Sequence, residues 1–226
     1  MDKSKHLNSA DKIGHLSQLG GIETYTINSG PAKGSKIAAV NTASPLRYTI
    51  LLDRAMDIHQ AFFSNHSIAW LSSNGPLPPN QAADWLKTWP GGLLTTCGLD
   101  HVGAPESDEN EKRGLHGPIS NIPAQITEIK NPDPASGLLD MSITGTVTQT
   151  TALGINIKLK RTITSTLYKP QLTISDTVTN LSDNPAPHMI LYHCNFGCPL
   201  VDKNSKILYK NAPTPMPNAN NAKIFN

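Results

Sequence analysis

The feature that most constrains this 226-residue chain is a repeated alternation of apolar and polar residues between residues 139 and 192. A period of two places apolar side chains on one face of an extended strand, whereas a helix needs a period near 3.6. Turn formers separate successive runs, as antiparallel strands require. The pattern therefore predicts four antiparallel strands, over 139–147, 153–163, 172–178 and 189–192.

Shorter apolar runs upstream predict three more strands, over 36–42, 46–53 and 57–63. One segment, 79–89, has the pattern of a helix of two or three turns. The charged stretch "ESDENEKR" (106–113) is expected to be a solvated loop. Because no repeat or linker divides the chain, we expect one mostly antiparallel all-β domain over residues 1–226, with 1–18 as a mobile N-terminal segment.

Composition excludes several classes of function. The net charge is +2 and the basic residues are scattered, so nothing favours nucleic-acid binding. No stretch of about 18 apolar residues predicts a membrane span, and the polar N-terminus lacks the apolar segment of a secretory signal. Three cysteines without framework spacing fit a reducing compartment. We therefore expect a cytoplasmic protein with no nucleic-acid partner, no membrane contact and no cofactor.

Two glycine-rich segments carry residues suited to a binding site. "WPGGLLTTCGLDHVGAP" (89–105) contains Asp100 and His101, and "RGLHGPISNIPA" (113–124) places His116 between two glycines. Flanking glycines let the backbone turn tightly and let a ligand approach closely. A solvent-exposed histidine in a turn is the alternative interpretation, and for His116 taken alone it is the more common one.

Other candidates have an equally good structural explanation. Arg54 and Asp57 end a strand run, where an ion pair or a turn cap explains them as well as a site does. Aromatic side chains suit the apolar faces of sugar rings, but core packing is the commoner role. That alternative applies to the three tryptophans, Trp70, Trp85 and Trp89.

The stretch "MILYHCNFGCPL" (189–200) groups His193 with Cys194 and Cys198. A metal-dependent enzyme using these three residues, with His188 as a further ligand, is one hypothesis. Cysteine-based zinc sites usually add a second pair of ligands, and Cys97 is solitary. Adjacent residues on a strand also point to opposite faces, so His193 and Cys194 should not converge on one ion. We therefore expect no metal.

Taken in order, several segments resemble the aldose 1-epimerase (galactose mutarotase-like) superfamily, and within it the bacterial branch of uncharacterised aldose epimerase-like proteins. They span residues 19–202, and the most specific are "GLHGPISNIPA" and "LTISDTVTNLSDNPAPHMILYHCNFGCPL". The resemblance implies an all-β fold, an antiparallel β-supersandwich of two large facing sheets, and an isomerase of carbohydrate metabolism that binds a hexose or a related small sugar.

The resemblance also implies roles for individual residues. Mutarotation interconverts the anomers of a free sugar through its open-chain aldehyde, with one group deprotonating the anomeric hydroxyl and another protonating the ring oxygen. His193 occupies the position of the family's general acid, and His116 that of a histidine bonded to the sugar near its ring oxygen. Arg54 is expected to contact sugar hydroxyls. Asp57, Asp100 and His101 are further substrate-binding candidates from similar motifs.

The general base is missing from the expected place. In the family it is a glutamate close to the C-terminus, but the last of the five glutamates here is Glu128, and Asp202 is the one carboxylate residue after His193. We therefore expect a member whose fold is incomplete at the C-terminus, with uncovered strand edges that favour homo-oligomers. The alternative function is a sugar-binding or regulatory domain without catalysis. The sequence does not identify the sugar.

Overall fold

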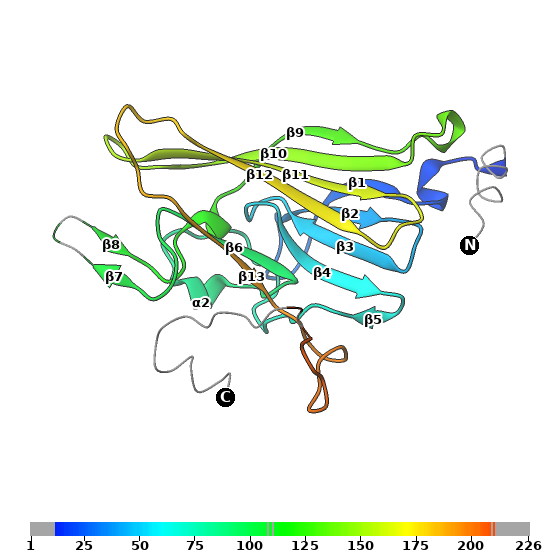
Figure 1. The fold of residues 1–226 in the computed structure, drawn as a ribbon, viewed down its shortest axis with the longest axis horizontal. Helices are drawn as coiled ribbons and strands as arrows, with labels where there is room; N and C mark the ends of the chain where they lie inside the picture. The colour runs from blue at the N-terminus through cyan, green and yellow to red at the C-terminus, as the bar shows by residue number, and fades with distance from the viewer. Residues whose placement is uncertain (1–11, 108, 110, 209, 211–226) are drawn as a thin grey trace.

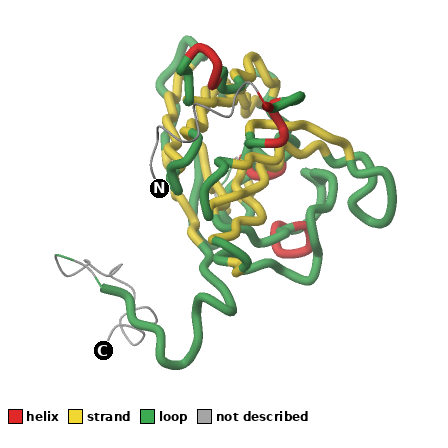
Figure 2. Tube along the Cα trace, turned by 90° about the vertical axis from the view of Figure 1, so that its right-hand side faces the viewer, coloured by secondary structure: helices red, strands yellow, loops and turns green. Residues whose placement is uncertain are grey.

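The structure is a computed structural model that describes residues 12–107, 109, 111–208 and 210. Two antiparallel sheets face each other, with the smaller sheet lying across one face of the larger (Figure 1). In the view turned by 90°, loops extend both beside and below the strands (Figure 2). The predicted all-β antiparallel sandwich is therefore confirmed.

The larger sheet has seven strands. Its order is β1 (Gly21–Thr26), β2 (Lys36–Asn41), β3 (Leu46–Leu51), β4 (Asp57–Phe63), β6 (Leu94–Leu99) and β13 (Met189–Cys194), and β5 (His66–Ser67) pairs with β4. The four-stranded sheet has the order β12 (Leu172–Asn180), β11 (Asn156–Thr166), β10 (Asp140–Thr150) and β9 (Gln125–Lys130). All seven strands predicted from apolar runs are present.

Two segments differ from the prediction. The helix expected over 79–89 is a single turn, α2 (Trp85–Thr88), because the Asn80 side chain and carbonyl accept hydrogen bonds from Ala82 and Ala83 and fold the preceding residues into a turn. The charged segment expected as a loop contains an exposed two-stranded ladder, β7 (Glu106–Ser107) and β8 (Lys112–Arg113).

The N-terminal prediction can be compared only in part, because residues 1–11 lie outside the described residues. Beyond them, His15 caps the short 3₁₀ helix η2 (Leu16–Gln18) and accepts a hydrogen bond from the Ser17 amide. Two further 3₁₀ helices are η3 (Ile119–Asn121), which packs against β6, and η4 (Pro134–Ser136). The capped turn shows that regular local structure begins before β1.

The core between the sheets is formed by the inward-facing parity of the alternating runs. Ile50 and Ile58 of the large sheet belong to one apolar cluster with Met141, Ile143 and Ile163 of the small sheet. Complete burial of such a side chain stabilises the fold by about 1.5–3 kcal/mol. The sequence alternation thus accounts directly for the contact between the two layers.

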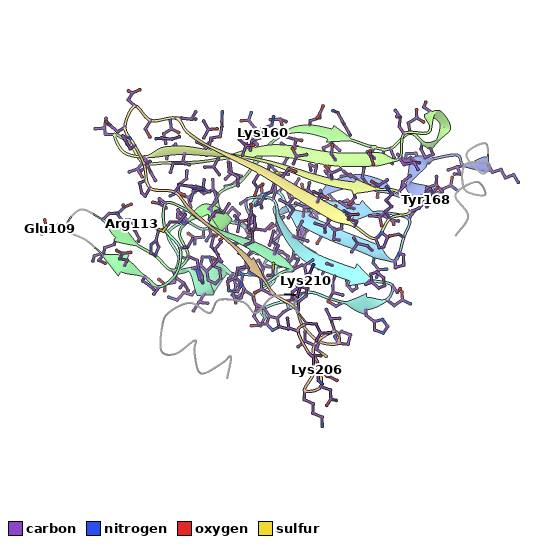
Figure 3. The ribbon with its side chains drawn as sticks, in the orientation of Figure 1. Glu109, Arg113, Lys160, Tyr168, Lys206 and Lys210 are labelled. Atoms are coloured by element: carbon purple, nitrogen blue, oxygen red, sulfur yellow. The ribbon has the colours of Figure 1, made fainter. Side chains whose placement is uncertain are left out.

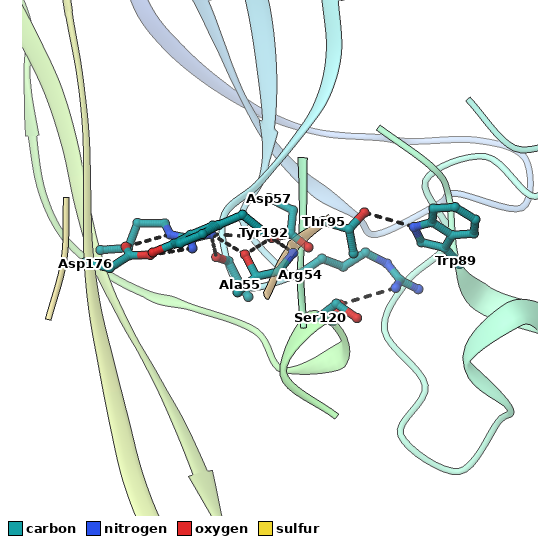
Figure 4. Close-up of polar contacts among 10 residues, drawn as sticks. Arg54, Ala55, Asp57, Trp89, Thr95, Ser120, Asp176 and Tyr192 are labelled. Carbon is teal, nitrogen blue, oxygen red and sulfur yellow. Dashed lines mark hydrogen bonds and ion pairs between the residues drawn. The ribbon is translucent and has the colours of Figure 1, made fainter. Parts of the chain in front are cut away.

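Arg161 interrupts this apolar layer and joins the two sheets. The β11 side chain is 0% exposed, and its guanidinium forms a two-point ion pair with Asp176 of β12, at 2.9 and 2.7 Å. Its Nη1 also donates to Thr96 Oγ1 (2.7 Å) and Asp57 Oδ1 (3.4 Å) in the large sheet. Tyr192 completes the network by donating to Asp176, as Figure 4 shows. The network fixes the register of one sheet against the other.

Candidate functional site

The two histidines singled out in the sequence lie together on the outer face of the large sheet. His193 of β13 pairs with Thr95 of β6, while the next β6 residue, Thr96, points inward and bonds Asp57. Strand alternation therefore assigns Thr95 and His193 to the face opposite the Arg161 network. The loop before β6 reaches this face, since Trp89 Nε1 donates to Thr95 Oγ1 at 2.9 Å (Figure 4).

The imidazole rings of His116 and His193 meet edge to face. Their centroids are 5.5 Å apart and their planes are inclined by 73°. The ring centroid of Trp85 lies 4.9 Å from that of His116, and the ring centroid of Trp89 lies 5.5 Å from that of His193. The structure thus brings together, within one aromatic cluster, two histidines that are far apart in sequence.

Three hydrogen bonds, two between backbone groups and one to the His116 ring, hold the His116 turn. The His116 amide donates to the Gly103 carbonyl (2.9 Å), and its carbonyl accepts from the Gly98 amide (3.0 Å). His116 has a φ of 61° and Gly117 a φ of 71°, and a Cβ on Gly117 would lie 2.5 Å from the carbonyl oxygens of Gly98 and His101. A glycine is required at position 117 for this close approach.

The third contact assigns the tautomer of His116. The Gly103 amide donates to His116 Nδ1 at 3.3 Å, so Nδ1 carries the lone pair and the proton of the neutral ring lies on Nε2. Burial lowers the pKa of His116, and the neighbouring His193 and His101 lower it further. His116 is therefore suited to donate a hydrogen bond through Nε2 as a neutral imidazole.

His193 is held differently, because its ring has an unused polar atom. Within the part of the chain that the structure describes, its buried Nδ1 has no hydrogen-bond partner. The strand end is fixed through the backbone instead, since Asn195 Nδ2 donates to the carbonyls of His193 (3.0 Å) and Gly92 (2.8 Å). The ring is thus positioned while its Nδ1 has no partner among the described residues.

The tryptophans form a continuous aromatic wall beside the histidines. Trp85 stacks on Trp89 at 4.6 Å, and Trp89 contacts Trp70 at 5.1 Å. Trp85 is buried and donates through Nε1 to Ser120 Oγ, whereas Trp70 is 42% exposed. The wall therefore extends from the interior to the surface, and an aromatic face of this kind can pack against the C–H groups of a sugar.

Arg54 and Asp57, both candidate sugar contacts, are buried and bonded to protein groups. Arg54 donates to the backbone carbonyls of Leu77, Ser120 and Pro78, at 2.9, 3.3 and 3.5 Å. Asp57 accepts from Thr96 and Arg161, and burial raises its pKa to about 6 although both partners lower it. These contacts support the loop and the sheet around the site. The sugar-binding roles of Arg54 and Asp57 stay predictions.

Asp100 and His101 lie next to the His116 turn. Asp100 Oδ1 accepts from Gln149 Nε2 at 2.6 Å. His101 donates through Nε2 to the Ala104 carbonyl (2.8 Å), and its Nδ1 lies 3.6 Å from Glu106 Oε2. Both side chains are buried and line a cleft of about 860 Å³. Their roles as sugar contacts also stay predictions.

The cysteines and the acidic residues do not assemble a metal site in the described part of the chain. No three His, Cys, Asp or Glu side chains there are grouped so that they could hold an ion. Cys194 and Cys198 are exposed, while Cys97 is buried, and burial raises the pKa of its thiol to about 12. Among the same residues, no helix is long and apolar enough to cross a membrane.

Several residues that shape the site were not predicted. Thr95 and Asn195 support Trp89 and the β13 end, and Gly103 fixes the His116 ring. Thr95 lies in β6, where all six residues are buried, so the strand shows no alternation. The available signal for β6 was the short segment "LLTTC" (93–97), which follows Gly91 and Gly92 and contains two β-branched threonines.

Comparison with solved structures supports the fold assignment. The chain is similar to a putative aldose 1-epimerase from Klebsiella pneumoniae (22% identity, TM-score 0.71), covering 88% of this chain and 52% of that one. It is also similar to a galactose mutarotase-like protein from Clostridium acetobutylicum (14%, TM-score 0.55, covering 83% and 57%) and to the Slr1438 protein from Synechocystis (12%, TM-score 0.55, covering 77% and 58%). The chain therefore has the galactose mutarotase-like fold and spans little more than half the length of these solved chains.

Sequence comparison gives the family. No curated protein sequence matches the chain. The sequence profile of one family, described as a domain of unknown function, DUF4432, matches residues 32–225. This match includes both histidine segments and every strand except β1. The chain belongs to the DUF4432 family.

Proposed function

We propose that this protein binds a free aldose at the paired imidazoles and interconverts the α and β anomers of that sugar. The single observation that carries the proposal is the 5.5 Å edge-to-face pair of His116 and His193 beside a wall of tryptophans. The fold it shares with a putative aldose 1-epimerase adds support. A small, neutral, polyhydroxylated ligand needs hydrogen-bonding groups and an apolar face, and this site supplies both.

The reaction requires proton transfer at two oxygens. Ring opening transfers the proton of the anomeric hydroxyl to a water molecule, breaks the bond between the anomeric carbon and the ring oxygen, and protonates that ring oxygen. His193 acts as the general acid at the ring oxygen and takes the proton back on closure. His116 donates an Nε2–H hydrogen bond to the sugar near the same oxygen. A well-placed general acid contributes about 10²–10⁴-fold in rate.

A second candidate function is sugar binding without turnover. Among the described residues, those in contact with either imidazole are tryptophans, the other imidazole and Gly103. None of these contacts comes from a carboxylate that could act as a base. A site that kept its binding groups without a base would recognise the sugar and leave its anomers at their spontaneous rate of exchange. This observation favours a carbohydrate-recognition or regulatory role as the alternative.

The acid assignment is tested with His193→Gln, which keeps a polar side chain of similar length but cannot transfer a proton. We expect anomer exchange of α-glucose or α-galactose, followed by NMR or polarimetry, to slow at least 100-fold relative to the unmodified protein. His66→Gln, on an exposed strand end away from the site, is the matched control. An unchanged rate in His193→Gln would refute the acid role, and calorimetric binding without any acceleration would favour the second candidate.

A further inference from the structure

Thr95 lies beside His193 and is bonded to the aromatic wall. The two residues are directly opposite each other in the antiparallel pairing of β6 with β13, so their side chains project side by side from the same face of the large sheet. Thr95 is 2% exposed, and its Oγ1 accepts a hydrogen bond from Trp89 Nε1 at 2.9 Å (Figure 4). One buried hydroxyl thus lies next to His193 and holds the ring that packs against it.

The backbone of Trp89 is held independently of Thr95. Its amide donates to the Trp85 carbonyl (2.9 Å), and its carbonyl accepts from Ser72 Oγ (2.6 Å) and Asn74 Nδ2 (3.1 Å). A fixed backbone still leaves rotation about the side-chain bonds, and the second of these torsions has broad, roughly two-fold preferences in tryptophan. The indole N–H is the only polar group of the side chain. Its bond to Thr95 therefore selects the orientation of the ring.

In this orientation the Trp89 indole meets the His193 ring edge to face. The two ring centroids are 5.5 Å apart and the ring planes are inclined by 71°. The centroid of the same indole lies 4.6 Å from that of Trp85 and 5.1 Å from that of Trp70. Because His193 Nδ1 has no partner among the described residues, no hydrogen bond at that atom fixes the imidazole. The aromatic contacts of the imidazole therefore limit its rotation.

Loss of the Thr95 hydroxyl would leave the Trp89 indole proton without its acceptor. Because Thr95 is buried, that proton is shielded from water, and an unpaired donor in such a place is unfavourable. The indole would turn towards another acceptor and present a different surface to His193. A general acid must lie within hydrogen-bond reach of the atom that it protonates, so a displacement of about 1 Å can lower a rate by about 100-fold.

We infer that Thr95 is a positioning residue for His193: its hydroxyl fixes the Trp89 indole, and the indole fixes the imidazole. Thr95 acts through the indole and takes no part in proton transfer. The effect on turnover rests on the proposed function, since it takes His193 as the general acid. The effect on the position of the imidazole does not, because it is present in the protein without sugar.

The test follows the His193 ring protons by NMR in the sugar-free protein, because their chemical shifts respond to the position of the neighbouring indole. Thr95→Val removes the acceptor at nearly constant shape, and we expect it to move these signals together with the indole N–H signal of Trp89. Thr95→Ser keeps a hydroxyl and should restore both. Thr42→Val removes another buried hydroxyl, which donates to the Leu46 carbonyl at 2.6 Å outside the site, and should move neither.

A double-mutant comparison shows whether Thr95 acts through Trp89. Trp89→Phe keeps an aromatic ring but removes the indole proton, so adding Thr95→Val to it should shift the His193 signals much less than in the unmodified protein. Equal shifts in the two backgrounds would overturn the route through the indole. Thr95→Ala, which also lacks the acceptor and adds no bulk, gives the same comparison if Thr95→Val does not fold.

Turnover separates this inference from the proposed function. We expect Thr95→Val to lower kcat for anomer exchange by about tenfold or more while KM changes less, and Thr95→Ser to recover most of the rate. Unmoved His193 signals and an unchanged kcat in Thr95→Val would overturn the inference and leave the proposed function standing. If the unmodified protein does not accelerate exchange, the proposed function fails, and the NMR comparison alone decides whether Thr95 positions the imidazole.

Discussion

At the scale of single residues, the two imidazoles of the site are held in complementary ways. His116 is fixed at its amide, its carbonyl and its Nδ1, so its ring presents one proton donor in one direction. His193 is fixed through its backbone, and its ring makes aromatic contacts. A fixed donor beside a ring whose Nδ1 has no partner among the described residues supports the proposed acid role of His193.

A third histidine, His59, makes the stability of the protein depend on pH. It is 4% exposed, and burial lowers its pKa to about 4, partly offset by a hydrogen bond with the Pro90 carbonyl. Above pH 6.5 the ring is neutral in both the folded and the unfolded chain. As the pH falls from 6.5 towards 4, the unfolded chain binds a proton that the folded chain excludes, so folding loses about 3 kcal/mol in total.

This linkage is tested by urea unfolding at pH 7.5 and pH 4.5. Because the raised pKa of Asp57, about 6, gives an opposite change over the same interval, the effect of His59 is measured as a difference: His59→Leu should lose about 2–3 kcal/mol less than the unmodified protein between pH 7.5 and pH 4.5. His66→Leu, which replaces an exposed histidine on β5, should keep the original pH dependence. Equal losses in the two variants would show that another group is responsible.

At the scale of secondary structure, the pattern in the sequence predicted the elements that have one buried and one outward face. β10 and β11 alternate between buried and less buried residues along their length. β6 was missed because it is buried on both faces, and α2 was overestimated because the Asn80 turn competes with the helix. β1 and β9 were also missed, and both are largely exposed. Periodicity reports burial on one face, so it fails where burial is complete, where burial is slight, or where local hydrogen bonds decide.

The candidate site was predictable only in part, for a related reason. The resemblance identified His116 and His193, but Thr95 and Gly103 act through contacts that no local pattern encodes. Arg161 had a signal, since it occupies the inward parity of its run between Leu159 and Ile163. A charge at an inward position predicts a buried ion pair, although its partners are distant in sequence and cannot be named from it.

The Arg161 network gives a prediction at this scale. Arg161→Ala should lower the free energy of unfolding by about 3–5 kcal/mol, because it leaves Asp57 and Asp176 buried without their cation. Lys160→Ala, one residue earlier on β11 and exposed on the outer face of the small sheet (Figure 3), should change stability by less than about 0.5 kcal/mol. Chemical denaturation measures both, and similar costs would contradict a stabilising network.

At the scale of the whole molecule, the four outer strands of the two main sheets differ in how well they are protected against pairing with another molecule. Three of these strands contain at least one charged residue, such as Glu23 in β1, Glu128 in β9 and Asp176 in β12. The fourth, β13, reads "MILYHC" and contains no Asp, Glu, Lys or Arg. Leu191 of β13 is 40% exposed. Charged side chains on edge strands discourage pairing between molecules, so β13 is the edge most open to it.

We therefore expect the protein to self-associate through β13, and expect Leu191→Lys to weaken that association at least tenfold by placing a charge on the edge. Sedimentation velocity over a range of concentrations measures the effect. Leu138→Lys, at a 65% exposed position between η4 and β10, is the matched control. If both variants associate as the unmodified protein does, the contact lies elsewhere.

The hydrogen bonds that anchor the loop before α2 to Arg54 have an evolutionary consequence. The guanidinium holds Leu77, Pro78 and Ser120 by their backbone carbonyls, so the attachment does not depend on which side chains these positions carry. Substitutions along this loop can alter the wall of the cleft while its anchoring persists. Related proteins can therefore diverge in ligand preference here without first having to rebuild the scaffold.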